Sequence, residues 1–290
     1  MPAFIKNHEK SELIAGLITM GAAALLLLGA ILVMTQCTAS PPGDDPGAST
    51  QSPSGPQDPT GPTLEANPYT AGNFQYNEKG YLTCLAGESL LGVDVSSHQG
   101  SIQWDKVAGK GIAFSMIRIG YRGYEQGNIV EDSHWKTNYQ GAKENGLMVG
   151  IYFFSQAITV EEAREEATKA LQWLDGAALD LPIVFDWEPI SDTARTANVK
   201  ADMLIACALA FCETVENAGY DAMVYFNIDL STTLLDLLQV QEAGYDFWLA
   251  MYKDSMTFPY QIEMWQYTDG GSVDGIDGNV DLNLYFPKSK

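Results

Sequence analysis

Basic residues are scarce in this chain. Lys and Arg together number 16, against 37 Asp and Glu, and the formal net charge is −21 at pH 7. A protein with this charge is repelled by nucleic acid and by anionic lipid, so the sequence argues against both as main partners. Anionic cell-wall polymers would repel it as well, so binding to a wall would depend on short-range contacts with sugars.

Cysteine is also scarce, with four residues in the chain. Cys207 and Cys212 lie five positions apart in a segment predicted to be helical, which is a poor geometry for a disulfide. The cysteines do not have the spacing of a zinc site. The sequence therefore indicates neither a required disulfide nor a structural metal.

Charged side chains are absent from residues 13–35. At about 1.5 Å per helical residue this segment is long enough to cross a bilayer. Two lysines precede it, and aspartates are the first charges after it, so we expect residues 1–12 in the cytoplasm. The prediction is a single-pass anchor in the cell membrane with everything after it outside. The alternative is a signal peptide, cleaved near Ala39, and a secreted protein.

The next segment, residues 36–72, cannot form a core. It is rich in Pro, Ser, Gly and Thr and contains no Lys or Arg. Such a composition predicts an extended, mobile linker. Residues 73–90 are typical of a short hairpin, and they lead into the folded domain that we expect over residues 91–288.

Strand-like apolar runs recur through this domain. The first six are separated by helical segments, and short loops rich in Gly, Asp and Pro join the last three. The apolar runs cover residues 91–96, 113–120, 148–154, 181–187, 222–227, 247–252, 262–267 and 279–285. This order predicts an α/β fold, an irregular β/α barrel of five β/α units plus three strands. In such a barrel the active residues lie at the carboxyl ends of the strands.

Two acids end the fourth of these strands. Asp186 and Glu188 are two positions apart, so they point to the same face, with Cα atoms roughly 6.5 Å apart. Close carboxylates separate each other's pKa values, so that one can stay protonated beside a charged neighbour. That arrangement is typical of glycosidic bond cleavage. The alternative is an acid pair that faces solvent or caps the next helix.

Two further acids interrupt apolar strands. Asp94 lies in the first strand and Asp281 in the last, and these strands are neighbours in a closed barrel. Both acids could therefore converge with Asp186 and Glu188 on one mouth, where several acids together raise at least one pKa. The alternative for Asp94 is a hydrogen bond to neighbouring loop backbone.

Aromatic residues gather near the strand ends. Their apolar faces suit stacking on sugar rings, and Tyr and Trp add polar groups. We expect the following to bind substrate: Tyr152, Tyr225, Trp248, Tyr252, Trp265 and Tyr267.

Six segments, taken in order, resemble the motifs of glycoside hydrolase family 25, the lysozyme-type N-acetylmuramidases. They are Gly92–Gly100 (GVDVSSHQG), Ile151–Phe154 (IYFF), Phe185–Glu188 (FDWE), Trp248–Tyr252 (WLAMY), Trp265–Tyr267 (WQY) and Val280–Asn283 (VDLN). The resemblance covers about residues 91–286. It implies the same irregular barrel and cleavage of the β-1,4 bond between N-acetylmuramic acid and N-acetylglucosamine in peptidoglycan glycan strands.

The resemblance also assigns roles to the four acids. It makes Glu188 the general acid/base, Asp186 the carboxylate that assists the intermediate, and Asp94 and Asp281 supporting acids. It implies a retaining mechanism in which the acetamido group of the substrate is the nucleophile, without a metal or an organic cofactor. We expect the catalytic domain to be monomeric.

Two other functions are alternatives. A chitinase-type glycosidase also ends a strand in Asp-x-Glu, but it needs a further Asp where this chain has Val184. A non-catalytic peptidoglycan-binding head would be expected to lack at least one of the four acids, and all four are present.

Overall fold

The structure is a computed structural model that describes residues 62–288. The predicted cytoplasmic segment, the membrane anchor and most of the predicted linker lie outside the described residues. Among the residues that are described, no helix has the length and apolar character needed to cross a membrane.

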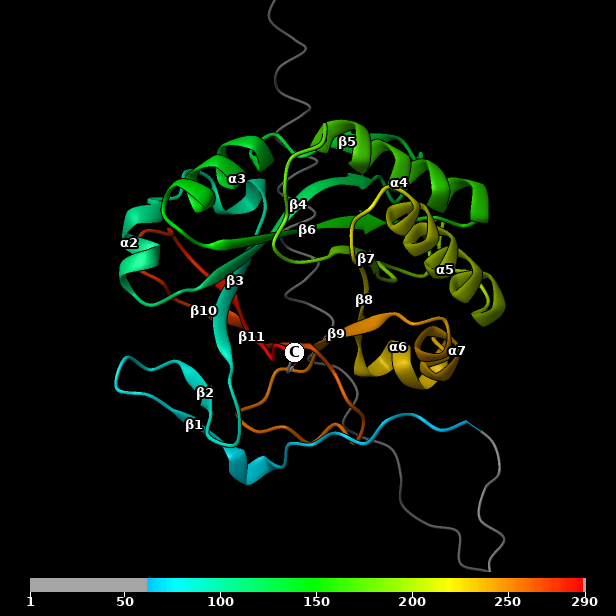
Figure 1. The fold of residues 1–290 in the computed structure, drawn as a ribbon. Coiled ribbons are helices and arrows are strands. Elements are labelled where there is room, and N and C mark those ends of the chain that lie inside the picture. Colours follow the sequence, from blue (N-terminus) through cyan, green and yellow to red (C-terminus); the bar gives the residue numbers. More distant parts are fainter. Residues whose placement is uncertain (1–61, 289–290) are drawn as a thin grey trace, which may run out of the picture. The chain divides into compact units, whose positions relative to one another are not determined.

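Eight strands close into a barrel (Figure 1). Neighbouring strands are parallel from β3 to β10, whereas β11 runs antiparallel to both β10 and β3 and closes the ring. The strands are β3 (Leu90–Val95), β4 (Phe114–Arg122), β6 (Met148–Ser155), β7 (Ile183–Trp187), β8 (Ala222–Asn227), β9 (Asp246–Ala250), β10 (Met264–Gly271) and β11 (Val280–Tyr285). The predicted irregular barrel is confirmed.

Helices connect the strands of the first five units and cover the outside of the barrel. They are α2 (Trp104–Gly109), α3 (Trp135–Glu144), α4 (Val160–Leu174), α5 (Ala201–Asn217), α6 (Ile228–Thr233) and α7 (Leu237–Glu242). The N-terminus of α4 shows how the sequence sets a helix start, because the Thr159 hydroxyl accepts the N–H of Glu162 at 3.2 Å. The Glu162 carboxylate in turn accepts the N–H of Ile158, a reciprocal cap that satisfies two free donors.

Three short elements complete the described residues. A strand that the sequence did not predict, β5 (Ile129–Glu131), pairs antiparallel with the end of β4. There are also two 3₁₀ turns: η1 (Ala71–Asn73) lies near the start of the described residues, and η2 (Ser97–Gln99) follows β3.

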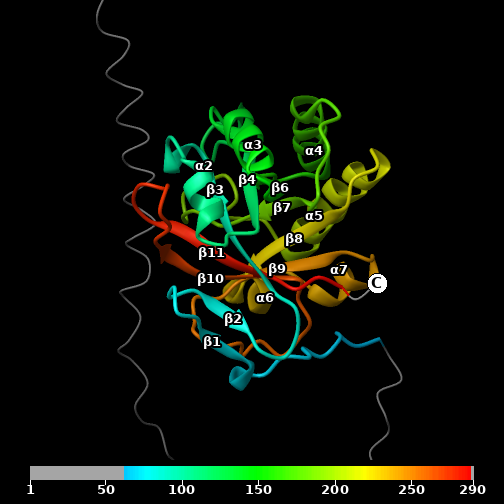
Figure 2. The ribbon, with the colours of Figure 1, turned by 60° about the vertical axis from the view of Figure 1, so that its left-hand side comes forward.

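A hairpin replaces helices on one side of the barrel. The strands β1 (Phe74–Tyr76) and β2 (Leu82–Cys84) pair antiparallel and lie next to β10 and β11, as Figure 2 shows. No helix joins β9 to β10 or β10 to β11, so the outer face of β10 needs another apolar cover. Phe74 provides it, with its ring edge-on to Trp265 at a centroid distance of 5.1 Å.

Residues just before the hairpin are attached to the domain. The N–H of Asn67 donates to the carbonyl of Pro259 at 2.9 Å, and Ala66 forms a bridge with Tyr260. Leu64 packs against the core. The sequence placed these residues in the linker, which we expected to continue to residue 72. The structure corrects that boundary, because pairing with the 259–261 segment satisfies their backbone groups.

Candidate active site

Four acidic side chains lie at the carboxyl end of the parallel strands. Asp186 is in β7 and Glu188 follows its last residue. Asp94 in β3 and Asp281 in β11 are direct partners in the antiparallel register. The charges of Glu188, Asp94 and Asp281 all act on the Asp186 carboxyl. The structure thus brings together the four acids named from the sequence.

Gln266 in β10 joins two of these acids to the aromatic side of the site. Its Nε2 donates to a carboxylate oxygen of Asp94 at 2.9 Å and of Asp281 at 3.2 Å. Its Oε1 accepts the hydroxyls of Tyr225 at 3.1 Å and Tyr252 at 3.2 Å. The two donor and two acceptor contacts fix which way the amide points.

Asn283 is a second amide that holds Asp94. Its Nδ2 donates to the Asp94 carboxylate at 2.8 Å, and its Oδ1 accepts the indole N–H of Trp248 at 2.8 Å. Sequence reasoning missed both Gln266 and Asn283. A signal was present, since each is a polar residue in an otherwise apolar strand, as Asp94 is.

Asp94 and Asp281 share a proton. The pKa of Asp281 is raised to about 9, mainly by burial and also by the charge of Asp94 and the hydrogen bond between the two carboxyl groups. Burial also raises the pKa of Asp94, but hydrogen bonds from Asn283, Gln266 and Asp281 lower it. Asp281 is therefore the protonated partner at neutral pH and donates to Asp94, because two adjacent carboxylates cannot both ionise easily.

The pKa of Glu188 lies where a general acid needs it. This pKa is raised to about 7, mainly by burial and also by the charge of Asp94, while a hydrogen bond from Asn227 acts in the opposite direction. At neutral pH a substantial fraction of Glu188 is protonated, which suits proton donation near the working pH. Asn227 was not named from the sequence as a site residue.

Asp186 is buried and incompletely bonded. Burial raises its pKa well above the usual value, and the charges of Glu188 and Asp94 add to this, while Arg118 lowers it. Its Oδ1 has no hydrogen-bond partner among the described residues. An unpartnered buried carboxyl oxygen is costly, so it indicates a position meant for a ligand donor.

Arg118 is a further charged residue that sequence reasoning missed. It forms an ion pair with Asp132 at 2.8 Å and donates to the Ser97 hydroxyl at 3.1 Å. It lies inside the apolar strand β4, the same kind of signal that marked Asp94. Its charge acts on Asp186 and on the nearby Tyr152.

Four of the six predicted aromatic residues lie on the side of the acids. The ring of Trp248 is edge-on to Tyr225 at 5.0 Å and to Tyr152 at 5.9 Å between centroids. Tyr252 is 53% exposed although its hydroxyl is bonded to Gln266. It therefore presents an open ring face beside the site.

The other two aromatic residues face away from the acids. Trp265 and Tyr267 flank Gln266 in β10, and successive side chains in a strand point to opposite faces. Trp265 is fully buried in the outer layer, where its indole N–H donates to the carbonyl of Met251 at 2.7 Å. Tyr267 packs against it in the same layer. The predicted substrate-binding role of these two residues is corrected: they are core residues.

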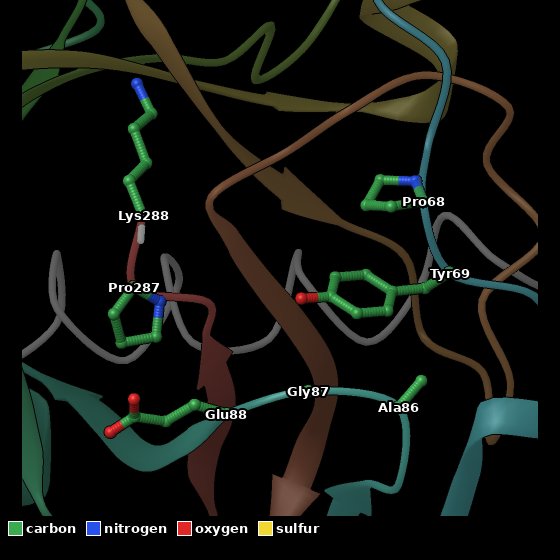
Figure 3. Close-up of a pocket in the computed structure, with 7 residues that line it drawn as sticks. All are labelled: Pro68, Tyr69, Ala86, Gly87, Glu88, Pro287 and Lys288. Atoms are coloured by element: carbon green, nitrogen blue, oxygen red, sulfur yellow. The ribbon is translucent and has the colours of Figure 1, made fainter. Parts of the chain in front are cut away.

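A separate hollow lies at the other end of the barrel. It measures about 560 Å³, and Figure 3 shows its lining, which includes Glu88 and Lys288. These residues flank the Leu90–Tyr285 pair of the β3–β11 ladder, whereas Asp94 and Asp281 lie at the far end of the same strands. The hollow therefore does not belong to the acid cluster.

Among residues 62–288, no group of three or more His, Cys, Asp or Glu side chains is arranged to hold a metal ion. Asp94, Asp281 and Glu188 instead accept hydrogen bonds from side-chain amides.

Comparisons with known proteins relate the chain to one sequence family. The sequence model of the family described as "Glycosyl hydrolases family 25" matches residues 93–276. An autolytic lysozyme of Clostridium acetobutylicum is 28% identical over 204 residues, which are 68% of this chain and 56% of that protein. The chain thus spans little more than half the length of this relative.

Two solved structures share the fold. The modular autolysin LytC of Streptococcus pneumoniae superposes with a TM-score of 0.62 at 23% identity, covering 77% of this chain and 52% of that one. A family 25 glycosyl hydrolase from Bacillus anthracis gives a TM-score of 0.56 at 22% identity, covering 69% and 90%.

Proposed function

The chain belongs to glycosyl hydrolase family 25, and from this premise we propose that it is a peptidoglycan hydrolase of the muramidase type. It cleaves the β-1,4 bond between N-acetylmuramic acid and N-acetylglucosamine. The observation that carries this proposal is the pairing of Glu188, whose pKa is raised to about 7, with a buried Asp186 whose Oδ1 lacks a partner. The similarity to an autolytic lysozyme supports it.

Glu188 acts first as the general acid. Its proton passes to the glycosidic oxygen as the bond from C1 to that oxygen breaks. The acetamido oxygen of the same sugar attacks C1 and forms a cyclic intermediate. Glu188, now ionised, then takes a proton from water as the water adds to C1, and the configuration at C1 is retained.

Asp186 assists the acetamido group. The unpartnered Oδ1 of Asp186 accepts the acetamido N–H of the bound sugar, which turns the acetamido oxygen toward C1. As the cyclic intermediate forms, positive charge develops on this nitrogen. Burial raises the pKa of Asp186 in the free site, but the positive charge that develops beside it favours the ionised form. The Asp186 carboxylate in turn stabilises that charge strongly in a water-poor site.

Asp94 and Asp281 supply one negative charge at a fixed position. The charge of Asp94 raises the pKa of Glu188 and so keeps the acid protonated until the substrate takes the proton. Gln266 and Asn283 hold Asp94 in place. Tyr252, with its exposed ring, stacks against a sugar of the glycan strand, and Tyr152, Tyr225 and Trp248 form the wall behind it.

The location of the enzyme is also a proposal. We place the domain outside the cell, held by residues 13–35 as a membrane anchor, because this segment lacks charge and basic residues precede it. Sequencing the N-terminus of the protein from its native host tests this. A mature chain that begins near residue 40 would favour the secreted form.

Fragment analysis tests the reaction. The full chain is incubated with purified peptidoglycan, and the products are reduced with borohydride and identified by mass spectrometry. We expect reduced muramic acid ends from the wild type and from Glu78→Gln, a change at an exposed acid, but none from Glu188→Gln. Reduced glucosamine ends would indicate a different bond. No release by a folded protein would favour a non-catalytic binding head.

A further inference from the structure

The end of β6 lies beside the end of β7, the strand that leads to Glu188. The last register pair between β6 and β7 joins Ser155 to Trp187, and Glu188 is the residue that directly follows β7. Beyond this pair, the side-chain amide of Gln156 donates to the main-chain carbonyl of Glu188 at 2.7 Å. A side chain thus takes the place of the main-chain donor that a longer strand would have offered.

Gln156 itself is held at every polar group. Its main-chain N–H donates to the Glu166 carboxylate, and its carbonyl accepts Nη1 of Arg195 at 2.6 Å. The Nε2 that reaches Glu188 also donates to the carbonyl of Ser155 at 2.8 Å. The Oε1 accepts the Thr196 hydroxyl at 3.2 Å. Gln156 is fully buried, so its side chain has one available orientation.

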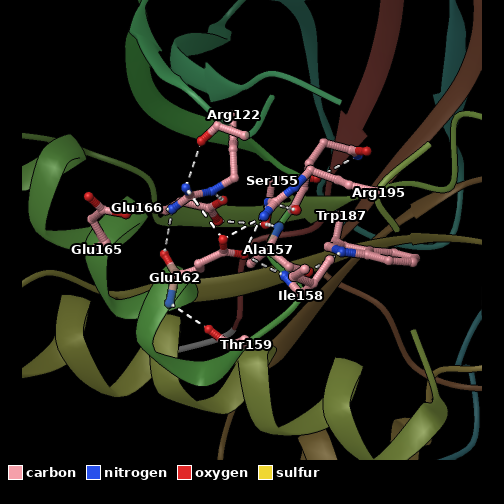
Figure 4. Close-up of polar contacts among 12 residues, drawn as sticks. Arg122, Ser155, Ala157, Ile158, Thr159, Glu162, Glu165, Glu166, Trp187 and Arg195 are labelled. Carbon is pink, nitrogen blue, oxygen red and sulfur yellow. Dashed lines mark hydrogen bonds and ion pairs between the residues drawn. The ribbon is translucent and has the colours of Figure 1, made fainter. Parts of the chain in front are cut away.

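Figure 4 shows a network of hydrogen bonds and ion pairs that links Ser155 and Ala157, the chain neighbours of Gln156, with α4 and Arg195. Arg195 lies on the segment that follows Glu188, and its guanidinium bonds both carboxylate oxygens of Glu162 in α4. Glu166, one turn further along α4, accepts Nε of Arg122 at 2.6 Å and the hydroxyl of Ser155 at 2.6 Å. A bidentate pair and a buried pair of this kind restrict motion. The chain on both sides of Gln156 is therefore fixed to α4.

Glu188 has few other main-chain restraints on its carboxyl side. The following residue is Pro189, which has no N–H to donate to a neighbouring strand. At the tip of the side chain, Asn227 bonds the carboxylate. Glu188 is thus held at two points: Gln156, directly after β6, bonds its main-chain carbonyl, and Asn227, at the end of β8, bonds its carboxylate.

We propose that Gln156 is the positioning residue of the catalytic acid Glu188. By fixing the carbonyl of Glu188 it sets the direction in which the carboxyl group leaves the backbone, and so the distance from its proton to the glycosidic oxygen. This inference rests on the proposed function. Displacing a catalytic group by about 1 Å can cost roughly 10²-fold in rate, so one hydrogen bond at this carbonyl has a large effect.

The test compares Gln156→Met with Ser155→Ala on soluble glycan fragments. Gln156→Met has a similar length but cannot donate to Glu188. Ser155→Ala removes a buried hydroxyl bonded to Glu166 in the same network and leaves the Glu188 contact in place. We expect kcat to fall about 10- to 100-fold in Gln156→Met, with KM within about twofold. In Ser155→Ala we expect kcat to stay within about threefold at a comparable loss of melting temperature.

The pH profile separates positioning from folding. If Glu188 moves away from Asn227, the alkaline limb of kcat/KM in Gln156→Met shifts upward, which a general loss of stability would not cause. If Gln156→Met does not fold, Thr196→Val replaces it, because this change removes only the donor to Oε1, and we expect kcat to fall about three- to tenfold. A folded variant with wild-type kcat and pH profile would overturn the inference. A wild type without muramic acid ends would instead overturn the proposed function.

Discussion

We expect the amide of Asn227 to influence the pH range over which the enzyme is active. Its Oδ1 caps α6 by accepting the N–H of Leu230 at 2.9 Å, while a hydrogen bond from its amide lowers the pKa of Glu188. Two substitutions separate these roles. Asn227→Ser keeps a capping oxygen but is too short to reach Glu188, and Asn227→Asp keeps the cap, removes the donor and adds a negative charge.

The hydrogen bond from Asn227 to Glu188 determines the size and the sign of the expected pKa change. It stabilises the ionised form of Glu188, so its loss raises the pKa. A hydrogen bond to a charged group contributes about 1.5–3 kcal/mol, and about 1.4 kcal/mol corresponds to one pKa unit. From a pKa of about 7, Asn227→Ser should move Glu188 to about 8–9, and Asn227→Asp further. Because Glu188 must be protonated to donate, activity should persist to higher pH.

The assay is kcat/KM on soluble glycan fragments from about pH 5 to about pH 10, since this ratio reports the free enzyme. The alkaline limb should lie lowest in the wild type, higher in Asn227→Ser and highest in Asn227→Asp. The control is Asp236→Ala, which removes the N-terminal cap of α7 at a position distant in sequence from the four acids. It should lower the free energy of unfolding by about 1 kcal/mol and leave the alkaline limb in place. A limb that stays in place or moves down in both Asn227 variants would refute the assignment of Glu188.

Four other outcomes can be measured. Asp281→Asn should keep kcat within about threefold at neutral pH, since Asp281 is already protonated there and an amide can replace its donor. Asp94→Asn should move the alkaline limb of kcat/KM down by about one pH unit, because the negative charge that raises the pKa of Glu188 is lost. Trp265→Ala should lower the free energy of unfolding by about 3–5 kcal/mol in chemical denaturation, with KM of the folded enzyme unchanged. Tyr252→Ala should raise KM about tenfold with a small effect on melting temperature, because its ring is largely exposed.

The order of strands and helices could be predicted because it depends on local patterns. Each strand is a short apolar run, and the capping residues Thr159 and Glu162 mark the N-terminus of α4. The pairing of Asp94 with Asp281 could also be anticipated, since closing a barrel makes the first and last strands neighbours. These features need only the sequence within each element and the rule that the barrel closes.

Other features depend on contacts between distant residues. The attachment of Asn67 to the segment near Pro259 leaves no signal in a stretch whose composition is that of a linker. Gln156 is equally hidden, because a glutamine that follows a strand is ordinary until the carbonyl of Glu188 lies 2.7 Å away. Asn227 ends a predicted strand and caps a short helix, which gave no reason to expect a contact with Glu188.

Trp265 and Tyr267 were predicted on the wrong face of β10, because the alternation of side chains along a strand does not say which face points to the acids. Trp265, Gln266 and Tyr267 must point to alternate faces of β10, so either both aromatic rings or the amide face the acids. The β10–β11 register decides this, because Gln266 pairs with Asn283, two positions from Asp281. Polar side chains that share the inner face of β11 draw the polar residue of β10 to the same side, where each amide can be satisfied.

The barrel interior explains why the acids have raised pKa values. Beneath the polar layer, the inside of the barrel is filled by buried apolar side chains, among them Phe114, Met116, Val184 and Met264. The packing is tight enough that a Cβ at Gly92 would lie 2.3 Å from the ring of Phe114. Water therefore cannot reach the acids from below, and a low dielectric disfavours their ionised forms. The closed barrel thus places the four acids above a packed apolar interior. The burial that results raises the pKa of Glu188 to about 7, so that a substantial fraction of this acid keeps its proton at neutral pH.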